Sequence, residues 1–82
     1  MDKRIGVIGI VIDDLSQVNE VNEILHQYSE IIIGRMGVPY REKGVSVISL
    51  IVDGTTDNIG ALSGKLGKLK GLSVKSALSK KN

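Results

Sequence analysis

Hydrophobic positions along the chain form four stretches with strand character and two stretches with helical spacing. Residues 4–12 place aliphatic side chains on both faces of a strand, and residues 45–52 repeat this two-faced pattern. In the first of these strands one face holds Ile5, Val7 and Val11, and the other holds Ile8, Ile10 and Ile12. A strand with one face in water normally alternates apolar and polar residues. We therefore expect both strands to be covered on both sides.

Residues 15–28 show the spacing of an amphipathic helix that opens after a polar cap. Asp14 and Gln17, three positions apart, resemble a capping box at its start. A polar, uncharged strip runs along one edge of this helix, where we expect it to rim the buried face. The predicted buried positions are Leu15, Val18, Val21, Ile24, Leu25 and Tyr28, and the strip consists of Asn19, Asn22 and His26.

A second helix is predicted after a cap at one of residues 55–57. Its apolar residues recur every three or four positions and form one stripe toward a core. These residues are Ile59, Leu62, Leu66 and Leu69. Gly71 stands where the C′ residue of the helix is expected, and residues 72–78 then alternate as a strand does. Asp53 and Gly54 are expected to end the strand that precedes this helix.

The remaining strand is predicted over residues 30–38. Pro39 has no N–H to donate to a sheet ladder, so this strand either lies at an edge or ends there. Residues 41–44 then form a charged hairpin loop. The element order is β-α-β-β-α-β, which is the order of the ferredoxin-like α+β fold, a four-stranded antiparallel sheet with two helices on one face.

In that fold the first and third strands are central, and one face of the sheet has no helices. Here the uncovered face would carry aliphatic side chains, which would leave a large apolar patch on a monomer. We therefore expect a second sheet to cover it in a homo-oligomer, either a dimer or a tetramer. The small size of the chain, 82 residues, favours the same conclusion, because a core of this size is near the lower limit for independent folding.

Composition predicts one domain, residues 1–78, followed by a flexible basic tail at residues 79–82. The chain has no cysteine and a single histidine, so we expect no metal site and no cofactor. Residues 1–41 hold four Lys/Arg and six Asp/Glu, whereas residues 42–82 hold seven and three. This lysine-rich half lacks interleaved aromatics, so nucleic-acid binding is the less favoured interpretation. Without a signal peptide or membrane span, a cytoplasmic location and no membrane partner are expected.

Catalytic residues are not predicted. The sequence has only one histidine that could act as a base for a serine nucleophile, and no serine lies in a nucleophile-elbow pattern. Asp13 and Asp14 follow the first strand and suit magnesium binding or acid–base chemistry, but adjacent carboxylates before a helix more commonly cap it.

Binding is easier to support than catalysis. Arg35, Tyr40 and Arg41 flank a glycine–proline kink and offer positive charge and an aromatic face to a small anion or polar metabolite. The plainer alternative is that Arg35 crosses a subunit interface and Tyr40 covers the loop. A stripe of glycines on the second helix, Gly60, Gly64 and Gly67, suits close approach of another subunit or a ligand, or is a tolerated surface run.

Two segments of the chain resemble the short proteins known as iron-only hydrogenase system regulators. They are Ile32–Glu42, and Ile59–Gly67 continuing through Gly71–Lys75. The similarity extends over nearly the whole chain. It implies an ACT-like domain, similar to the oligomerising, metal-sensing domain of the nickel-responsive regulator. That relative holds nickel with histidines and a cysteine and reads DNA with a ribbon-helix-helix segment, and this chain matches neither feature.

The resemblance also implies where a ligand would bind. In ACT domains small molecules bind at subunit interfaces, at the turn after the first strand, which here is Asp13, Asp14 and Leu15. The regulator motif offers a second candidate set, which consists of Arg35, Gly37, Pro39 and Tyr40.

We therefore expect a non-enzymatic oligomeric sensor that acts on a hydrogenase maturation protein or a transcription factor. The alternatives are a structural interaction module without a ligand and, less favoured, a direct nucleic-acid-binding regulator.

Overall fold

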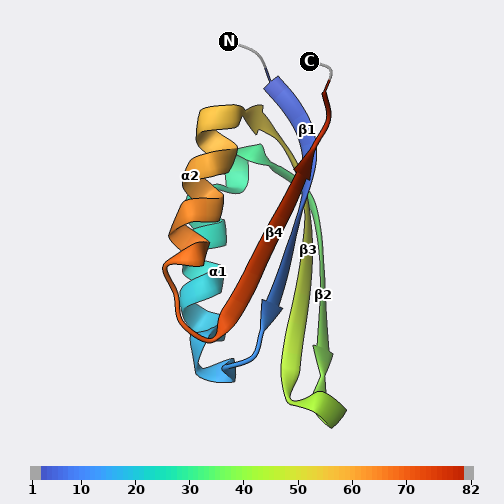
Figure 1. The fold of residues 1–82 in the computed structure, drawn as a ribbon, viewed down its shortest axis with the longest axis vertical. Helices are drawn as coiled ribbons and strands as arrows, with labels where there is room; N and C mark the ends of the chain where they lie inside the picture. Colours follow the sequence, from blue (N-terminus) through green and yellow to red (C-terminus); the bar gives the residue numbers. More distant parts are fainter. Residues whose placement is uncertain (1–2, 81–82) are drawn as a thin grey trace.

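Strands and helices alternate as β-α-β-β-α-β along residues 3–80, the part of the chain that the computed structural model describes (Figure 1). The regular elements are β1 (Lys3–Ile12), α1 (Val18–Gln27), β2 (Ile32–Tyr40), β3 (Val45–Thr55), α2 (Thr56–Gly67) and β4 (Leu72–Leu78). Short 3-10 turns at Leu15–Gln17, Ser29–Ile31 and Arg41–Lys43 connect them. The predicted element order is confirmed.

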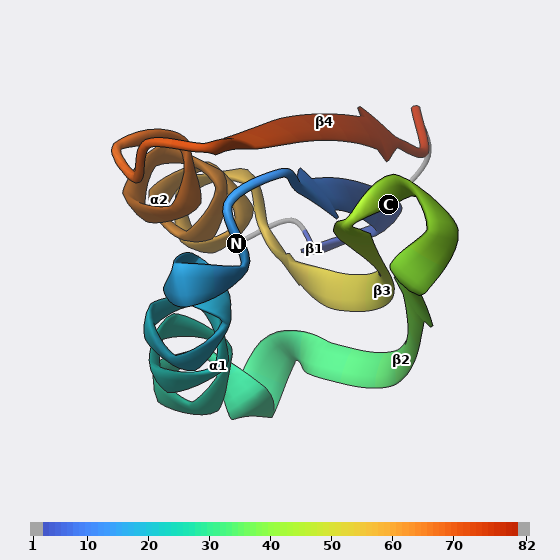
Figure 2. The same cartoon turned by 90° about the horizontal axis from the view of Figure 1, so that it is seen from below.

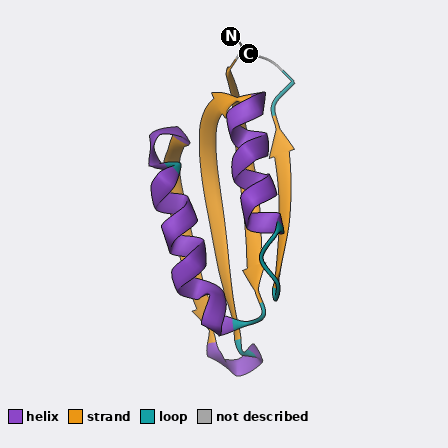
Figure 3. Ribbon diagram, turned by 90° about the vertical axis from the view of Figure 1, so that its left-hand side faces the viewer, coloured by secondary structure: helices purple, strands orange, loops and turns teal. Residues whose placement is uncertain are grey.

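The four strands form one antiparallel sheet in the order β2-β3-β1-β4. The first and third strands are central, as predicted. Both helices pack on the same face of this sheet (Figures 2 and 3). The structure is therefore the predicted ferredoxin-like α+β sandwich, and its second sheet face has no helix against it.

The core lies between the helices and the sheet. From the sheet it takes the even-numbered residues of β1 and β3, and from the helices it takes the residues of the two predicted apolar stripes. The fully or almost fully buried members are Ile8, Ile10, Ile12, Val21, Ile24, Leu25, Ile48, Leu50, Val52, Ile59, Leu62 and Leu66. No polar or charged residue of the described chain is buried with them. We call this side of the sheet the covered face.

Two predictions around α1 need correction. Leu15 was expected on the buried face of the helix, but it is 51% exposed because residues 15–17 form a 3-10 turn before the α-helix begins at Val18. A 3-10 turn rotates each residue further than an α-helix does, so the stripe does not extend back to Leu15. Asp14 does act as a cap, and its carboxylate accepts from the Ser16 N–H and not from Gln17.

The end of β3 also differs from expectation. Asp53 and Gly54 do not end the strand, which runs on through Thr55 with Gly54 paired to Arg4. Ile31 packs closely over Gly54, and a Cβ added at Gly54 would lie only 3.0 Å from the Ile31 Cγ2. Thr55 then caps α2, and its hydroxyl accepts from the Asn58 N–H at 3.1 Å.

Gly71 connects the loop before β4 to the loop after β1 by backbone hydrogen bonds. Its carbonyl accepts from the backbone N–H groups of Asp13 at 2.7 Å and Asp14 at 2.9 Å. Gly71 has φ 78°, and a Cβ at this position would overlap the Asp14 side chain, so only glycine suits it. The helix α2 ends earlier than predicted, with Lys68 at its C-cap. Gly71 therefore shapes the connection to β4 and is not the C′ residue.

Two further expectations concern the strand that contains Pro39 and the predicted basic tail. Pro39 lies within β2, which is an edge strand, but the strand starts at Ile32 and not at residue 30. Of the predicted basic tail, Ser79 continues beside β1, where its N–H donates to the Ile5 carbonyl at 2.8 Å. Residues 81–82 lie outside the described part of the chain.

Candidate functional site

The face of the sheet without helices carries a set of exposed apolar side chains from three of its strands. We call it the open face. It consists of Ile5, Val7 and Val11 of β1, Ile33, Met36, Val38 and Tyr40 of β2, and Val47 and Ile51 of β3. Exposure of these side chains ranges from 38% for Val47 to 68% for Met36. Single exposed apolar residues are common on proteins, but a contiguous set marks an interaction surface.

The strand register arranges the open face in rows across the sheet. Val38, Val47 and Val11 form one apolar row, and Ile51 and Val7 belong to another. The row between them contains small or polar residues together with one long apolar chain, and these are Met36, Ser49, Gly9 and Lys75. Beside this middle row is a hollow of about 310 Å³, lined by Gly34, Arg35, Met36, Ser49 and Ile51. The open face is thus apolar but not flat.

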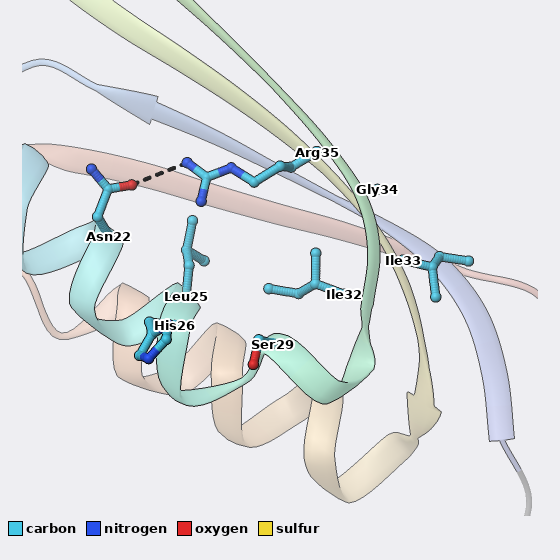
Figure 4. Close-up of a pocket in the computed structure, with 8 residues that line it drawn as sticks. All are labelled: Asn22, Leu25, His26, Ser29, Ile32, Ile33, Gly34 and Arg35. Atoms are coloured by element: carbon cyan, nitrogen blue, oxygen red, sulfur yellow. Dashed lines mark hydrogen bonds between the residues drawn. The ribbon is translucent and has the colours of Figure 1, made fainter.

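A larger pocket lies on the opposite side of β2, between that strand and α1 (Figure 4). We call it the α1–β2 pocket. Its volume is about 510 Å³, within the roughly 300–1,000 Å³ of typical small-molecule sites. It is lined by Asn22, Leu25, His26, Ser29, Ile32, Ile33, Gly34 and Arg35. Leu25 and Ile32 point toward one another inside it, while Ile33 points away to the open face.

A β-bulge in β2 directs Arg35 into this pocket. Ile32 pairs with Val52 but Gly34 pairs with Ile51, so the strand has one extra residue, Ile33. Strict alternation from Ile32 would place Arg35 on the open face. The extra residue reverses this, and Arg35 faces α1 opposite Leu50 of the covered face. Glycine in a strand often marks a bulge, and Gly34 was the available sequence signal.

Arg35 and α1 together supply the polar groups of the pocket. The guanidinium of Arg35 donates to the Asn22 Oδ1 at 3.0 Å (Figure 4). Within residues 3–80 this guanidinium has no carboxylate partner, and the His26 ring and the Ser29 hydroxyl have no hydrogen-bond partner either. A guanidinium has five N–H donors, so most of its donors face the pocket and solvent. The sequence had shown Asn22 and His26 as a polar strip but did not connect them with Arg35.

The ligand-binding residues predicted from the sequence divide into two groups. Only Arg35 lines the α1–β2 pocket. Pro39 pairs with Ser46, which also pairs with Ile12, so Pro39 and Tyr40 lie at the sheet end where Asp13 and Asp14 begin their loop. Pro39 is four residue steps along β2 from Arg35, a distance of about 13 Å. A ligand role for either group stays a prediction.

The predicted ligand-binding residues outside the α1–β2 pocket have the following surroundings. Gly37 pairs with Ile48 on the covered side of β2. Tyr40 belongs to the open face, and its hydroxyl donates a long hydrogen bond of 3.4 Å to the Glu42 carboxylate. Asp14 accepts from both the backbone N–H and the hydroxyl of Ser16. These contacts give Tyr40 and Asp14 partners within the chain, and a ligand role for either residue stays a prediction.

The predicted glycine stripe lies on the exposed side of α2, away from its buried leucines. A Cβ added at Gly60, Gly64 or Gly67 would meet nothing within 4 Å. This backbone is therefore accessible, and an interface role for it remains a prediction. No group of three or more His, Cys, Asp or Glu residues suited to a metal ion occurs within residues 3–80. In the same range, no helix has the length and hydrophobicity needed to cross a membrane.

The family model described as "TM1266-like: Iron-only hydrogenase system regulator, putative" matches residues 4–76. The chain belongs to this family. Its family membership confirms the resemblance seen in the two sequence segments. The comparison with curated proteins gave no match.

Solved structures place the family among ferredoxin-like folds. The uncharacterized protein TM1266 from Thermotoga maritima is 42% identical, with a TM-score of 0.91 over 96% of this chain and 100% of that one. The C-terminal domain of MgtC from Mycobacterium tuberculosis is 10% identical, with a TM-score of 0.72 over 94% of this chain and 88% of that one. The apo form of CPII, a nitrogen regulatory PII-like protein from Thiomonas intermedia K12, is 10% identical, with a TM-score of 0.56 over 95% of each chain. The last two likenesses concern the fold alone.

Proposed function

We propose that this family member is a non-enzymatic regulatory protein of an iron-only hydrogenase system that works as a homo-oligomer assembled through its open face. In this proposal a small molecule or a partner protein binds at or beside the subunit interfaces. The family description supports the regulatory role. The single observation that carries the assembly is the apolar open face, which has no helix against it (Figure 1).

The open face is close in size to a small protein–protein interface. Four strands spaced about 4.8 Å apart, over a length of about seven residues, give a face of roughly 450 Å², and the exposed apolar side chains lie on β1, β2 and β3 of it. Two such faces stacked together would bury roughly 900 Å² in total, which is slightly below the roughly 1,000 Å² expected of a specific protein–protein interface. The same face would be at the upper end of the apolar patches found on monomers.

The shape of the open face supports a second copy of the chain as its binding partner. Met36 is the most exposed apolar side chain on this face, and the hollow beside Gly34 and Ser49 is next to it. In a two-fold symmetric pair of sheets, each copy presents both features to the other. The flexible Met36 side chain of one copy would then fill space above the middle row of its partner.

The proposed ligand sites are those predicted above. In the sequence, Arg35, Gly37, Pro39 and Tyr40 form one predicted set and Asp13 with Asp14 forms the other. In the fold, Pro39 and Tyr40 lie at the sheet end near Asp13 and Asp14, about 13 Å from Arg35. Tyr40 and Met36 belong to the open face, so a ligand on the β2 side would lie close to an assembled interface. The proposed protein partners are a hydrogenase maturation protein or a transcription factor, and Gly60, Gly64 and Gly67 are a second candidate contact surface. Nucleic acid remains the less favoured partner.

Native mass spectrometry of the purified protein over a range of concentrations tests the proposal. We expect a dimer or tetramer that persists at low micromolar concentration, because burial of the open face offsets the entropy lost on association. Extra mass on the oligomer would identify the class of a retained ligand. A clean oligomer supports the assembly and favours the interaction module without a tightly bound ligand. A protein that stays monomeric at all concentrations would contradict the assembly.

A further inference from the structure

The α1–β2 pocket combines one positive charge with an apolar floor. The charge is the Arg35 guanidinium, which is held against Asn22 and has no carboxylate partner within residues 3–80. The floor consists of Leu25, which is buried, and Ile32, which is half-buried. A guanidinium is planar and binds the two oxygens of a carboxylate in parallel. The pocket therefore matches a molecule with an anionic head and a short aliphatic body.

The helix α1 limits how much negative charge the pocket accepts. Its other polar members, His26 and Ser29, lie at or just beyond the last turn of α1, which ends at Gln27. The C-terminal end of a helix carries a partial negative charge, so it disfavours a second anionic group nearby. Of the residues lining the pocket, Arg35 alone carries a fixed positive charge. These features favour a monoanion over a phosphate dianion.

We propose that the α1–β2 pocket binds a small aliphatic monocarboxylate, with its carboxylate on Arg35 at the Asn22 end and its alkyl body against Leu25 and Ile32. Asn22 acts as a positioning residue, because its Oδ1 holds the guanidinium over the pocket. The bulge at Ile33 makes the site available, since without the extra residue Arg35 would face the open side of the sheet. This inference names the ligand class of the proposed sensing role and rests on that role, but it does not depend on the assembly.

NMR titration of ¹⁵N-labelled full-length protein with isovalerate tests the site. We expect saturable shifts of backbone amides that line the pocket, chiefly those of Asn22, His26 and Arg35. Isovaleramide has the same shape without the charge and should bind about tenfold more weakly or worse. Acetate lacks most of the alkyl body and should also bind about tenfold more weakly. Inorganic phosphate should be weaker than isovalerate.

Variants separate this site from general anion binding. Arg35→Gln should weaken isovalerate binding about tenfold or more, and Arg35→Lys should recover only part of it, because lysine lacks the planar fork. Lys43→Gln is the control for loss of one positive charge, since Lys43 lies in the 3-10 turn after β2 and does not line the pocket, and this variant should bind normally. The fold of each variant is checked from its own amide spectrum.

Several results would overturn the inference. These are no saturable shift with isovalerate in the folded protein, equal binding of isovaleramide, tighter binding of phosphate, or binding that survives Arg35→Gln. The oligomeric state is measured in the same samples, so failure of the pocket and failure of the assembly are seen separately. An oligomer without isovalerate binding removes only the ligand class. A monomer that binds isovalerate through Arg35 supports the pocket and removes the proposed assembly.

Discussion

The two faces of the sheet have nearly the same chemistry and opposite surroundings. On β1, Ile8 is fully buried beneath the helices, while its neighbour Val7 is 44% exposed on the open face. On β3, Leu50 and Ile51 show the same contrast. Aliphatic residues alone therefore do not distinguish the inside of this protein from its outside. What differs is what packs against each face. The helices of the same chain cover one face, and we propose that a second copy of the chain covers the other.

This difference implies two separable contributions of the aliphatic residues. Side chains on the covered face stabilise the fold of one chain, because they are buried in every molecule. Those on the open face gain most of their burial only on assembly, so they are expected to stabilise the oligomer. Neighbouring residues of one strand should then give different results when each is changed.

The largest expected effect is on the covered face. Ile8→Ala removes a fully buried side chain from the centre of the core and should lower the free energy of unfolding by about 2–5 kcal/mol. Urea denaturation followed by circular dichroism measures this change. If the variant does not fold, Ile8→Val should fold and lose about 0.5–1.5 kcal/mol. A loss below about 0.5 kcal/mol for Ile8→Ala would contradict the assigned core.

The next effect is on assembly. Val7→Lys places a charge at the centre of the open face, next to Ile51, and should weaken self-association about 100-fold or more, or about 3 kcal/mol. The fold of one chain should change by less than about 1 kcal/mol, because Val7 is already half-exposed. Analytical ultracentrifugation measures the first effect and urea denaturation the second. Asn19→Lys adds the same charge on exposed α1 and should leave assembly intact; equal behaviour of the two variants would exclude the open face as the interface.

The smallest effect concerns the loop that joins β1 to the helix over the covered face. The Ser16 hydroxyl, and then its backbone N–H, donate to Asp14 and hold the pKa of this carboxyl below its ordinary value of 3.8. A lowered pKa in the folded state stabilises the protein above the unfolded pKa. That stabilisation is lost as the pH falls from about 4 through the folded pKa.

Ser16→Ala removes the largest cause of this shift. The variant should therefore lose less stability than the parent protein between about pH 5 and pH 2, although it starts slightly less stable at neutral pH. Because Asp14 is exposed, the difference should be small. Urea denaturation over a pH series compares the slopes of the two proteins. Parallel curves would show that the bonds from Ser16 contribute no pH dependence.

The candidate site was only partly predictable. Arg35 was selected from its position in a glycine- and proline-containing segment, and the structure places it in a pocket. Its pocket neighbours Asn22 and His26 were recognised as a polar strip without a partner. The missing information was the register of β2. A single extra residue at Ile33 decides which side of the sheet Arg35 faces, and pairing with β3 determines where that residue is accommodated.

The amino-acid sequence by itself determined the element order, the ferredoxin-like fold and the two-faced central strands. These follow from local periodicity, because each strand or helix shows which of its sides is apolar. Tertiary structure alone decided that β3 runs through Gly54 and that Arg35 turns toward α1. Each of these depends on a neighbour distant in the sequence: Arg4 and Ile31 for Gly54, and β3 for the bulge. Leu15 leaves the core for a local reason, the 3-10 turn at residues 15–17. Local patterns specify faces, whereas pairing between distant segments specifies which residues meet.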